Sequence, residues 1–467
     1  MEIKQLYTSC LSEAAYFISS EGEAAVIDPL RDVDTYLKLA EEQGVKIKYI
    51  FETHFHADFI SGHTELSRKT GAPIVFGPDT EAGYKVHIAK DNEEFSIGKI
   101  KIKAIHTPGH TIESTCYLLQ DEAGAPYCIF TGDTLFVGDV GRPDLFSGNI
   151  RKEDLAAMMY DTLQNKIKTL DDNIIVYPAH GPGSSCGKAL GPETFSTIGA
   201  QKAGNYALQD MTKEAFIKTV TSGLSTPPSY FPVNARINQQ GSESLDDVYS
   251  KGLQPLHVTA FKEKVTEGAW LLDTRSSSIF TQGFIPESVS IGLDGRFAEW
   301  AGTLIPHKQA IVLVTEPGME KESITRLARV GIDNVQGFLE GGYEAWVSAG
   351  EPIDIIIDIE PDELAMDLPY DNLLEVIDVR KPSEFDIAHV KDAHNVPLDT
   401  LSDPLNIAMI DENNNLYVHC AGGYRSVIAA SLLKRQGYHN LRNVLGGFAK
   451  MKLEKGIPLI TPDKVNI

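Results

Sequence analysis

Four short motifs of histidine and aspartate each follow an apolar, strand-like run in the first half of the chain. The first, residues 53–59 (THFHADF), comes directly after the run 47–51. The other three are 107–110 (TPGH), 131–133 (TGD) and 177–180 (YPAH). Imidazole nitrogens and carboxylate oxygens held at the ends of several strands are suitable ligands for a transition metal. A single such histidine is usually an ordinary polar residue, but four clusters in this order predict a metal site.

The order H-x-H-x-D, PGH, TGD and PAH resembles the metallo-β-lactamase superfamily. The resemblance implies an αβ/βα sandwich with the metal at one edge of two sheets. Members with two metals usually carry a histidine directly after the aspartate of the first motif. Here that position is Phe59, which has no ligand atom, so a second metal position would keep only Asp58, Asp133 and His180. The resemblance therefore implies one metal.

Carried over to this sequence, the one-metal branch of the superfamily implies His54, His110 and Asp133 as ligands. Two histidines and one carboxylate form the facial triad that leaves open positions on Fe(II), so we expect one Fe(II) per chain. Zinc more often takes a third histidine or a thiolate, and His56 is the candidate third nitrogen. Zinc is therefore the alternative cofactor. Three residues are expected around the metal or in a vestigial second metal position: His56, Asp58 and His180.

Residues that follow these motifs resemble the persulfide dioxygenases, which oxidise a thiol-bound sulfane sulfur to sulfite. They are 131–136, 138–144, Gln201, Lys202, Asn205 and 227–231.

This resemblance extends over residues 1–245 and implies a low-molecular-weight thiol persulfide and O₂ as substrates. Arg142 and Lys188 are candidate anchors for a carboxylate-bearing thiol such as glutathione, because guanidinium and ammonium groups pair with carboxylates. For Lys188 a solvated surface charge is an equally good interpretation.

The second half of the chain contains a repeat. Residues 271–275 (LLDTR) match 376–380 (VIDVR), an offset of 378 − 273 = 105, and Gly341-Gly342-Tyr343 matches Gly446-Gly447-Phe448 at the same offset. Each copy alternates strand-like runs with helix-length segments, which predicts a parallel sheet flanked by helices. Each copy has the length of a typical domain, about 100 residues.

The second copy carries a cysteine in the segment 418–426 (VHCAGGYRS). We expect a strand to end at His419, Cys420 to open a short loop, and a helix to begin near Ser426. Inward-pointing backbone N–H groups and a helix N-terminus favour thiolate over thiol, and Arg425 adds a fixed positive charge.

The pattern C-x-x-x-x-R-S with the upstream D-V-R resembles the rhodanese sulfurtransferases, whose cysteine forms a persulfide. It implies that Cys420 and Arg425 are catalytic. Three further loop residues are candidates for substrate binding: Gly422, Gly423 and Tyr424.

The first copy lacks this chemistry. Thr315 occupies the place of Cys420, and its loop, residues 315–320 (TEPGME), has no thiol and no arginine. The residue that corresponds to Arg425 is Met319 or Glu320, and neither replaces a guanidinium group. We therefore expect a catalytically silent rhodanese-like copy.

We expect an α/β protein of three domains, in line with its 467 residues. They are a metallo-β-lactamase-fold domain over 1–245, the silent copy over 246–355 and the active copy over 356–467. The run 239–244 is the best linker candidate, residues 211–220 suggest a short amphipathic helix, and 351–358 suggests the first strand of the last domain.

Charge and cysteine usage limit the partners and the compartment. A net charge of −23 disfavours nucleic acid and anionic membrane surfaces. Five widely spaced cysteines without a C-x-x-C motif indicate a reducing compartment. The N-terminus lacks signal-peptide features and no apolar run approaches the roughly 20 residues that span a bilayer, so we expect a cytoplasmic enzyme. A homo-oligomer is compatible with the sequence.

Taken together, the sequence predicts a persulfide dioxygenase fused to a tandem rhodanese, acting in hydrogen sulfide detoxification. Cys420 would load persulfide or combine sulfane sulfur with sulfite to give thiosulfate. The alternative is a zinc-dependent thioester hydrolase like glyoxalase II with a rhodanese docking module, against which Phe59 counts. Cys186, close in sequence to His180, is either a thiol of the site or, as we favour, a loop packing residue. The sequence does not distinguish glutathione, coenzyme A, bacillithiol and free cysteine as the thiol.

Overall fold

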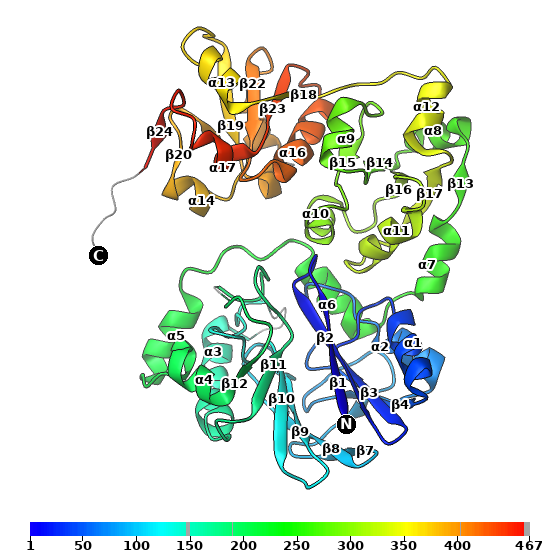
Figure 1. Ribbon diagram of the computed structural model, residues 1–467, viewed down its shortest axis with the longest axis vertical. Helices are drawn as coiled ribbons and strands as arrows, with labels where there is room; N and C mark the ends of the chain where they lie inside the picture. Colours follow the sequence, from blue (N-terminus) through cyan, green and yellow to red (C-terminus); the bar gives the residue numbers. More distant parts are fainter. Residues whose placement is uncertain (146–149, 189, 402, 462–467) are drawn as a thin grey trace. The chain divides into compact units, whose positions relative to one another are not determined.

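The chain forms two compact units in the computed structural model (Figure 1), which describes residues 1–145, 150–188, 190–401 and 403–461. The first unit comprises Met1–Asp247 with Leu327–Gly331, and the second comprises Val248–Arg326 and Ile332–Ile467. Within the described ranges, no helix combines the length and the apolar character that a membrane span needs.

Two six-stranded sheets form the first unit, in the orders β1-β2-β3-β4-β5-β6 and β12-β11-β10-β9-β8-β7. In the first sheet β1 to β3 pair antiparallel and β3 to β6 pair parallel. Central strands are covered on both faces, and all eight residues of β2 are buried. The strands are β1 (Glu2–Thr8), β2 (Glu13–Ser20), β3 (Glu23–Ile27), β4 (Lys46–Phe51), β5 (Ile74–Phe76), β6 (His87–Ile88), β7 (Glu94–Ile97), β8 (Ile100–His106), β9 (Thr115–Gln120), β10 (Pro126–Gly132), β11 (Ile175–Pro178) and β12 (Ser196–Thr197).

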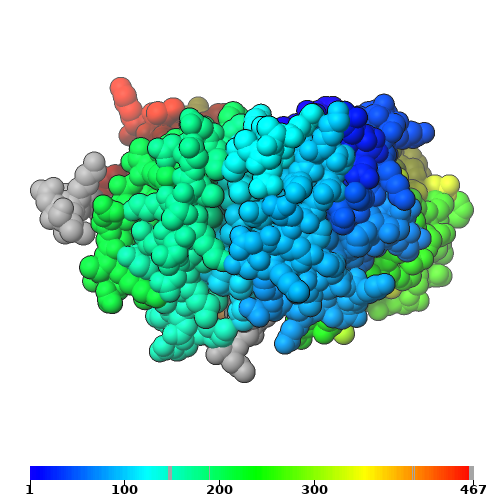
Figure 2. Space-filling model, turned by 90° about the horizontal axis from the view of Figure 1, so that it is seen from below, coloured from blue at the N-terminus to red at the C-terminus, as the bar shows by residue number. Residues whose placement is uncertain are grey.

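Helices cover the outer faces of the two sheets. One apolar cluster lies between the sheets and joins Tyr16 of β2 to Phe130 of β10, whose ring centroids are 4.8 Å apart. A second cluster packs α1 on the first sheet, and a third packs α3 and α5 on the second. Figure 2 shows one face of this unit, on which the blue N-terminal residues lie beside the cyan and green residues that follow. The helices are α1 (Asp34–Gln43), α2 (His63–Thr70), α3 (Lys152–Thr162), the π-helical turn η1 (Leu163–Ile167), α4 (Ile198–Gly204), the 3₁₀ turn η2 (Tyr206–Leu208), α5 (Lys213–Thr221) and α6 (Phe231–Gln240).

The second unit contains the two repeat copies, each built on a five-stranded sheet, except that Leu327–Gly331 of the first copy belong to the first unit. The orders are β13-β17-β16-β14-β15 and β18-β23-β22-β19-β21, and each of these pairings is parallel, as predicted. A small antiparallel pair, β20 with β24, completes the second copy. The strands are β13 (Pro255–Leu256), β14 (Trp270–Asp273), β15 (Val289–Ser290), β16 (Ile311–Val314), β17 (Val335–Leu339), β18 (Ile357–Ile359), β19 (Leu374–Asp378), β20 (His389–Val390), β21 (His394–Asn395), β22 (Asn415–His419), β23 (Leu441–Val444) and β24 (Leu459–Ile460).

Helices of similar placement accompany the two sheets. In the first copy, residues of α8 and α12 share an apolar cluster with the sheet, through Phe261 and Trp346. The helices are α7 (Leu245–Gly252), α8 (Val258–Thr266), α9 (Ser277–Gln282), α10 (Phe297–Leu304), α11 (Glu320–Ala328), α12 (Gly342–Ser348), α13 (Pro361–Asp367), α14 (Pro382–Ile387), the 3₁₀ turn η3 (Leu398–Thr400), α15 (Pro404–Ile407), α16 (Tyr424–Arg435) and α17 (Gly447–Met451).

Three local expectations can be compared with these elements. The helix expected over 211–220 is α5, which begins after the capping side chain of Thr212. The strand expected over 351–358 is shorter, because β18 begins only at Ile357. The helix expected near Ser426 begins two residues earlier, at Tyr424, since Gly423 adopts a positive φ of 112° as its N-cap. The domain boundaries 1–245, 246–355 and 356–467 remain our proposal. The first boundary, at residue 245, falls on the first residue of α7.

Candidate active sites

The four histidine and aspartate motifs lie at the carboxyl ends of four strands, as predicted. The first two follow β4 and β8, and the other two begin within the last residues of β10 and β11. Gly132 is needed where β10 ends, because it has a φ of +51° and a Cβ there would lie 2.5 Å from the Thr53 hydroxyl. This close approach brings the motif at the end of β10 against the motif after β4.

His54, His110 and Asp133 form one group of candidate ligands. One ligand atom from each lies within 4.8 Å of the other two, and all three side chains are buried. The Nε2 atoms of His54 and His110 lie 3.9 Å and 3.5 Å from Asp133 Oδ2. Among the described residues neither carboxylate oxygen of Asp133 has a hydrogen-bond partner. A buried carboxylate without donors is costly unless a cation binds it, so the group fits a metal.

A second group consists of His56, Asp58 and His180, whose ligand atoms also lie within 4.8 Å of one another. Asp133 touches both groups, because its Oδ1 lies 3.5 Å from His180 Nε2. Phe59 is fully buried, and its ring centroid lies 4.4 Å from that of His56. The position after Asp58 is therefore filled by an aromatic ring that packs against the imidazole.

Three of the imidazoles are oriented through Nδ1. In each, Nδ1 lies within hydrogen-bond distance of an oxygen, which leaves Nε2 directed at the carboxylates. The Thr53 hydroxyl donates to Asp28, so it accepts from His54 Nδ1. The Nδ1 contacts are His54 with Thr53 Oγ1 (2.9 Å), His110 with Arg142 O (2.8 Å) and His180 with Ser12 O (3.1 Å).

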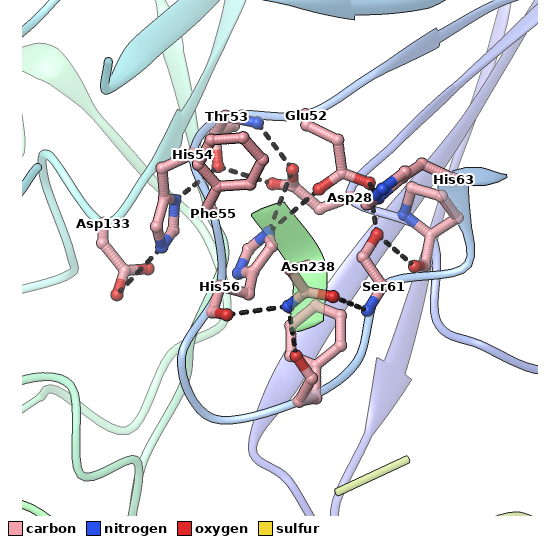
Figure 3. A network of polar contacts seen from close by, with 12 residues as sticks. Asp28, Glu52, Thr53, His54, Phe55, His56, Ser61, His63, Asp133 and Asn238 are labelled. Atoms are coloured by element: carbon pink, nitrogen blue, oxygen red, sulfur yellow. Dashed lines mark hydrogen bonds and ion pairs between the residues drawn. The ribbon is translucent and has the colours of Figure 1, made fainter. Parts of the chain in front are cut away.

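His54 and His56 have opposite electrostatic environments. Burial and the neighbouring imidazoles lower the pKa of His54 well below its ordinary value, which favours the neutral form that binds a metal. Burial also lowers the pKa of His56, but the carboxylates of Asp28, Glu52 and Asp58 outweigh it and raise the pKa to about 10. His56 Nε2 lies 3.1 Å from Asp28 Oδ1 and 3.6 Å from Glu52 Oε2. His56 is thus turned toward carboxylates of the protein (Figure 3).

Asn238 of α6 holds the loop that carries the first motif (Figure 3). Its side-chain Nδ2 donates to the backbone oxygens of His56 and Phe59, both at 2.7 Å. Its Oδ1 accepts from the Ser61 N–H at 2.9 Å. One buried amide therefore fixes three points of the loop between 56 and 61.

Three residues of the site, Asp28, Glu52 and Asn238, were not predicted from the sequence. Asp28 directly follows β3, so the pattern of a strand followed by an acidic residue could have identified it. Glu52 directly precedes the first motif and pairs with His63 Nδ1 at 3.0 Å. Asn238 lies 182 residues from His56, and nothing in the sequence connects the two.

The two predicted substrate anchors have partners within the protein. The Arg142 guanidinium is 3% exposed, pairs with both Asp144 oxygens at 2.7 and 2.8 Å, and also donates to Ser225 O. Lys188 Nζ donates to the backbone oxygens of Thr219 and Ser222, both at 2.5 Å. Substrate anchoring by Arg142 and Lys188 remains a prediction.

Cys186 lies at the second group of ligands. Its Sγ and ligand atoms of Asp133 and His180 lie within 4.8 Å of one another, and the residue is 2% exposed. Burial, reinforced by the carboxylates of Asp58 and Asp133, raises the pKa of the Cys186 thiol well above its usual value. The sequence favoured Cys186 as a loop packing residue. It is buried as such a residue would be, but its thiol also lies beside candidate metal ligands.

A small cavity reaches the first group of ligands. Its volume is about 50 Å³, and α6 supplies part of its wall. The lining residues are Phe55, Ala57, His110, Thr111, Glu113, Leu145, Ala235 and Gln239.

The cysteine loop of the second copy has the expected placement after β22. Cys420 is buried, and the Gly423 N–H donates to its Sγ at 3.1 Å. Arg425 forms a bidentate ion pair with Glu384 of α14, with distances of 2.7 and 2.9 Å. A Cβ on Gly422 would meet no atom within 4 Å, so this residue borders open space. The positive charge at the end of the loop is thus shared with a carboxylate that was not predicted from the sequence.

The first copy keeps an aspartate–arginine pair that the second copy also has, but not the thiol of the loop. Thr315 follows β16 and is buried. Arg275 pairs with Asp273 at 2.6 Å, and Arg380 pairs with Asp378 at the same distance. The two copies therefore share a scaffold and differ in the reactive residue.

Comparisons with known proteins match both halves of the chain. A family model of the metallo-beta-lactamase superfamily matches residues 9–180, and a model of the rhodanese-like domain matches 257–349 and 360–454. A solved metallo-beta-lactamase structure from Staphylococcus aureus subsp. aureus COL is 34% identical. The match covers 73% of this chain and 98% of that chain, with a TM-score of 0.64. These matches bear out the predicted αβ/βα sandwich followed by two rhodanese-like domains.

Two further relatives are similar to the first half. The structure of ETHE1 from Myxococcus xanthus is 30% identical, with coverage of 51% of this chain and 99% of that chain and a TM-score of 0.45. A probable hydroxyacylglutathione hydrolase from Schizosaccharomyces pombe is 31% identical over 172 residues, 36% of this chain and 62% of the relative. The match covers less than two thirds of the length of such curated hydrolases.

Proposed function

Because this chain belongs to the metallo-beta-lactamase superfamily and continues into two rhodanese-like domains, we propose that it is a persulfide dioxygenase with sulfurtransferase activity. Two features support the proposal: His54, His110 and Asp133 form one group of candidate ligands, and a buried phenylalanine, Phe59, occupies the position directly after Asp58. Two nitrogens and one carboxylate on one side of a site suit Fe(II) with open positions.

In this proposal His54, His110 and Asp133 hold one Fe(II), which supplies redox chemistry between O₂ and the sulfur of a thiol persulfide. The reaction consumes RSSH, O₂ and water and yields RSH, sulfite and two protons. Thr53 and the Arg142 backbone oxygen keep the two imidazoles in their orientation. The cavity beside His110 has a volume of about 50 Å³, so only a few waters could accompany a substrate there.

The rhodanese half handles the sulfane sulfur. A persulfide on Cys420 transfers its outer sulfur to sulfite, so that an S–S bond to cysteine breaks, an S–S bond to sulfite forms, and thiosulfate and the Cys420 thiolate result. The Gly423 N–H stabilises that thiolate, because it donates to Sγ at 3.1 Å. Together the two reactions would remove sulfide-derived sulfur in the manner of a detoxification enzyme.

A second candidate is a zinc-dependent thioester hydrolase with a rhodanese docking module. The 31% identity to a probable hydroxyacylglutathione hydrolase favours it, and so does the intact group of His56, Asp58 and His180. Phe59 counts against it, because a second zinc would lack a nitrogen ligand at that position.

Metal analysis of anaerobically purified protein separates the two candidates. We expect about one iron per chain, and uptake of O₂ with formation of sulfite on addition of a glutathione persulfide, because the site offers one facial triad. Inductively coupled plasma mass spectrometry and an oxygen electrode measure both. Two zinc ions per chain, with thioester hydrolysis and no O₂ uptake, would refute the dioxygenase proposal.

Thr315→Ala tests whether the first rhodanese copy is silent. We expect thiocyanate formation from thiosulfate and cyanide within about twofold of the wild-type rate, because a hydroxyl that stays protonated at neutral pH transfers no sulfur. A colorimetric thiocyanate assay measures the rate, and thermal unfolding checks the fold. A loss of more than about tenfold in a folded variant would mean that the first copy takes part in the chemistry.

A further inference from the structure

Tyr424 ties the cysteine loop to the silent copy. It is the first residue of α16 and follows Gly423 in the loop that begins at Cys420. Its hydroxyl donates a hydrogen bond of 2.7 Å to the backbone oxygen of Gly292. Gly292 belongs to the silent copy and lies between β15 and α10, within the same compact unit. A side chain of the active loop is therefore held by the copy that has no nucleophile.

The backbone of the silent copy also packs closely against the Tyr424 ring. A Cβ on Gly295 would lie 2.4 Å from two atoms of that ring, which is far inside van der Waals contact. Gly295 has no left-handed φ that would itself require glycine, so the requirement comes from the ring alone. The backbone of the silent copy thus fixes both the hydroxyl and the plane of Tyr424.

The rest of α16 is held by the same copy. The backbone N–H of Ser290 donates to Ser431 Oγ at 3.0 Å. The Arg435 guanidinium lies 4.3 Å from the centre of the Trp270 ring. The silent copy therefore contacts α16 at its first turn, its middle and its last turn.

The position of α16 matters for the sulfur because the helix begins next to the N–H that contacts it. Gly423 donates to Cys420 Sγ and is bonded directly to Tyr424. We propose that the silent copy is a positioning element of the sulfurtransferase site. It fixes Tyr424 through Gly292 and Gly295, and it thereby aims the Gly423 N–H at Cys420. This role rests on the proposed function of Cys420 as sulfur carrier, and it gives the Tyr424 hydroxyl a partner other than substrate.

Tyr424→Phe and Gly295→Ala test the proposal through the reactivity of Cys420. We expect alkylation of Cys420 by iodoacetamide to slow by about fivefold in Tyr424→Phe, in keeping with one lost hydrogen bond, and by more in Gly295→Ala. The pH at half-maximal alkylation should rise in both variants, because a misaimed N–H favours the thiolate less. Mass spectrometry of the Cys420 peptide across pH measures rate and profile.

Matched variants and a double variant complete the experiment. Tyr370→Phe, at an 86% exposed tyrosine, and Gly204→Ala, where a Cβ meets no atom, should leave alkylation unchanged. In a Tyr424→Ala background Gly295→Ala should add nothing, because the ring it collides with is gone. Wild-type alkylation in both single variants, with or without a lower melting temperature, would overturn the proposal. The two proposals can fail separately. If the variants alter alkylation but the wild-type protein makes no thiosulfate, the positioning role is supported and only the proposed function of Cys420 as sulfur carrier is refuted.

Discussion

Asp133→Ala is expected to remove the metal and O₂ uptake together. The Oδ2 atom of Asp133 lies within 4 Å of Nε2 of both His54 and His110, so the substitution leaves two imidazoles without their carboxylate. Residues that only orient a ligand change metal affinity by about 10- to 100-fold, and loss of a direct ligand should exceed about 100-fold. Iron per chain after dialysis and O₂ uptake with a persulfide are the measurements.

Two control variants and one melting measurement show whether the loss of metal in Asp133→Ala is specific. His56→Ala should keep part of the metal, because His56 faces Asp28 and Glu52. Asp210→Ala, at a fully exposed aspartate that pairs with Lys168, should change neither quantity. The metal-free Asp133→Ala protein should melt no lower than metal-free wild type, because it loses a buried carboxylate without a hydrogen-bond partner among the described residues. Full iron content in folded Asp133→Ala would mean that the ligands lie elsewhere.

Cys420→Ser is expected to divide the two activities. The substitution keeps the shape of the side chain but replaces a nucleophilic thiolate by a hydroxyl that stays protonated at neutral pH. O₂ uptake and sulfite formation with an added persulfide should continue, because the candidate iron ligands lie in the other compact unit. Formation of thiosulfate and thiocyanate should fall by more than about 1,000-fold, as expected for loss of a nucleophile.

Sulfite and thiosulfate are quantified after derivatisation, side by side in wild type and variant. Cys10→Ser, at a partly exposed cysteine, is the control and should retain both activities. Thiosulfate formation in Cys420→Ser at the wild-type rate would show that Cys420 is not the sulfur carrier. Complete loss of O₂ uptake in a folded, iron-loaded variant would show instead that Cys420 delivers persulfide to the iron.

Much of the architecture could be predicted because it depends on short-range patterns. Apolar runs of strand length preceded each histidine or aspartate motif, and strand ends at one edge of a sandwich bring such motifs together. The repeat predicted two parallel sheets, and their strand orders correspond. The convergence of His54, His110 and Asp133 followed from the resemblance and not from spacing alone.

The remaining features depend on contacts between distant segments, which a single sequence does not encode locally. One partner of Arg142 is Ser225 O, 83 residues away. Because this partner is distant in sequence, the sequence alone could not distinguish an exposed substrate anchor from a buried ion pair at Arg142. Cys186 lies beside Asp133, and the Arg142 N–H donates to its backbone oxygen at 2.9 Å across 186 − 142 = 44 residues. Glu384 meets Arg425 across 41 residues, and this pairing requires the sheet to be in place. Even the start of α16 was set by one backbone angle, the positive φ of Gly423.

The amide of Asn238 has a consequence for how such modules can be exchanged between genes. Asn238 lies on α6, well beyond residues 9–180 that match the superfamily model, yet it holds the loop on which His56 and Phe59 sit. α6 also lines the cavity through Ala235 and Gln239. A recombination breakpoint placed after residue 180 would separate the metal loop from its brace. A segment that keeps this brace must therefore extend at least through Gln240, the last residue of α6, and the same compact unit also includes Leu327–Gly331.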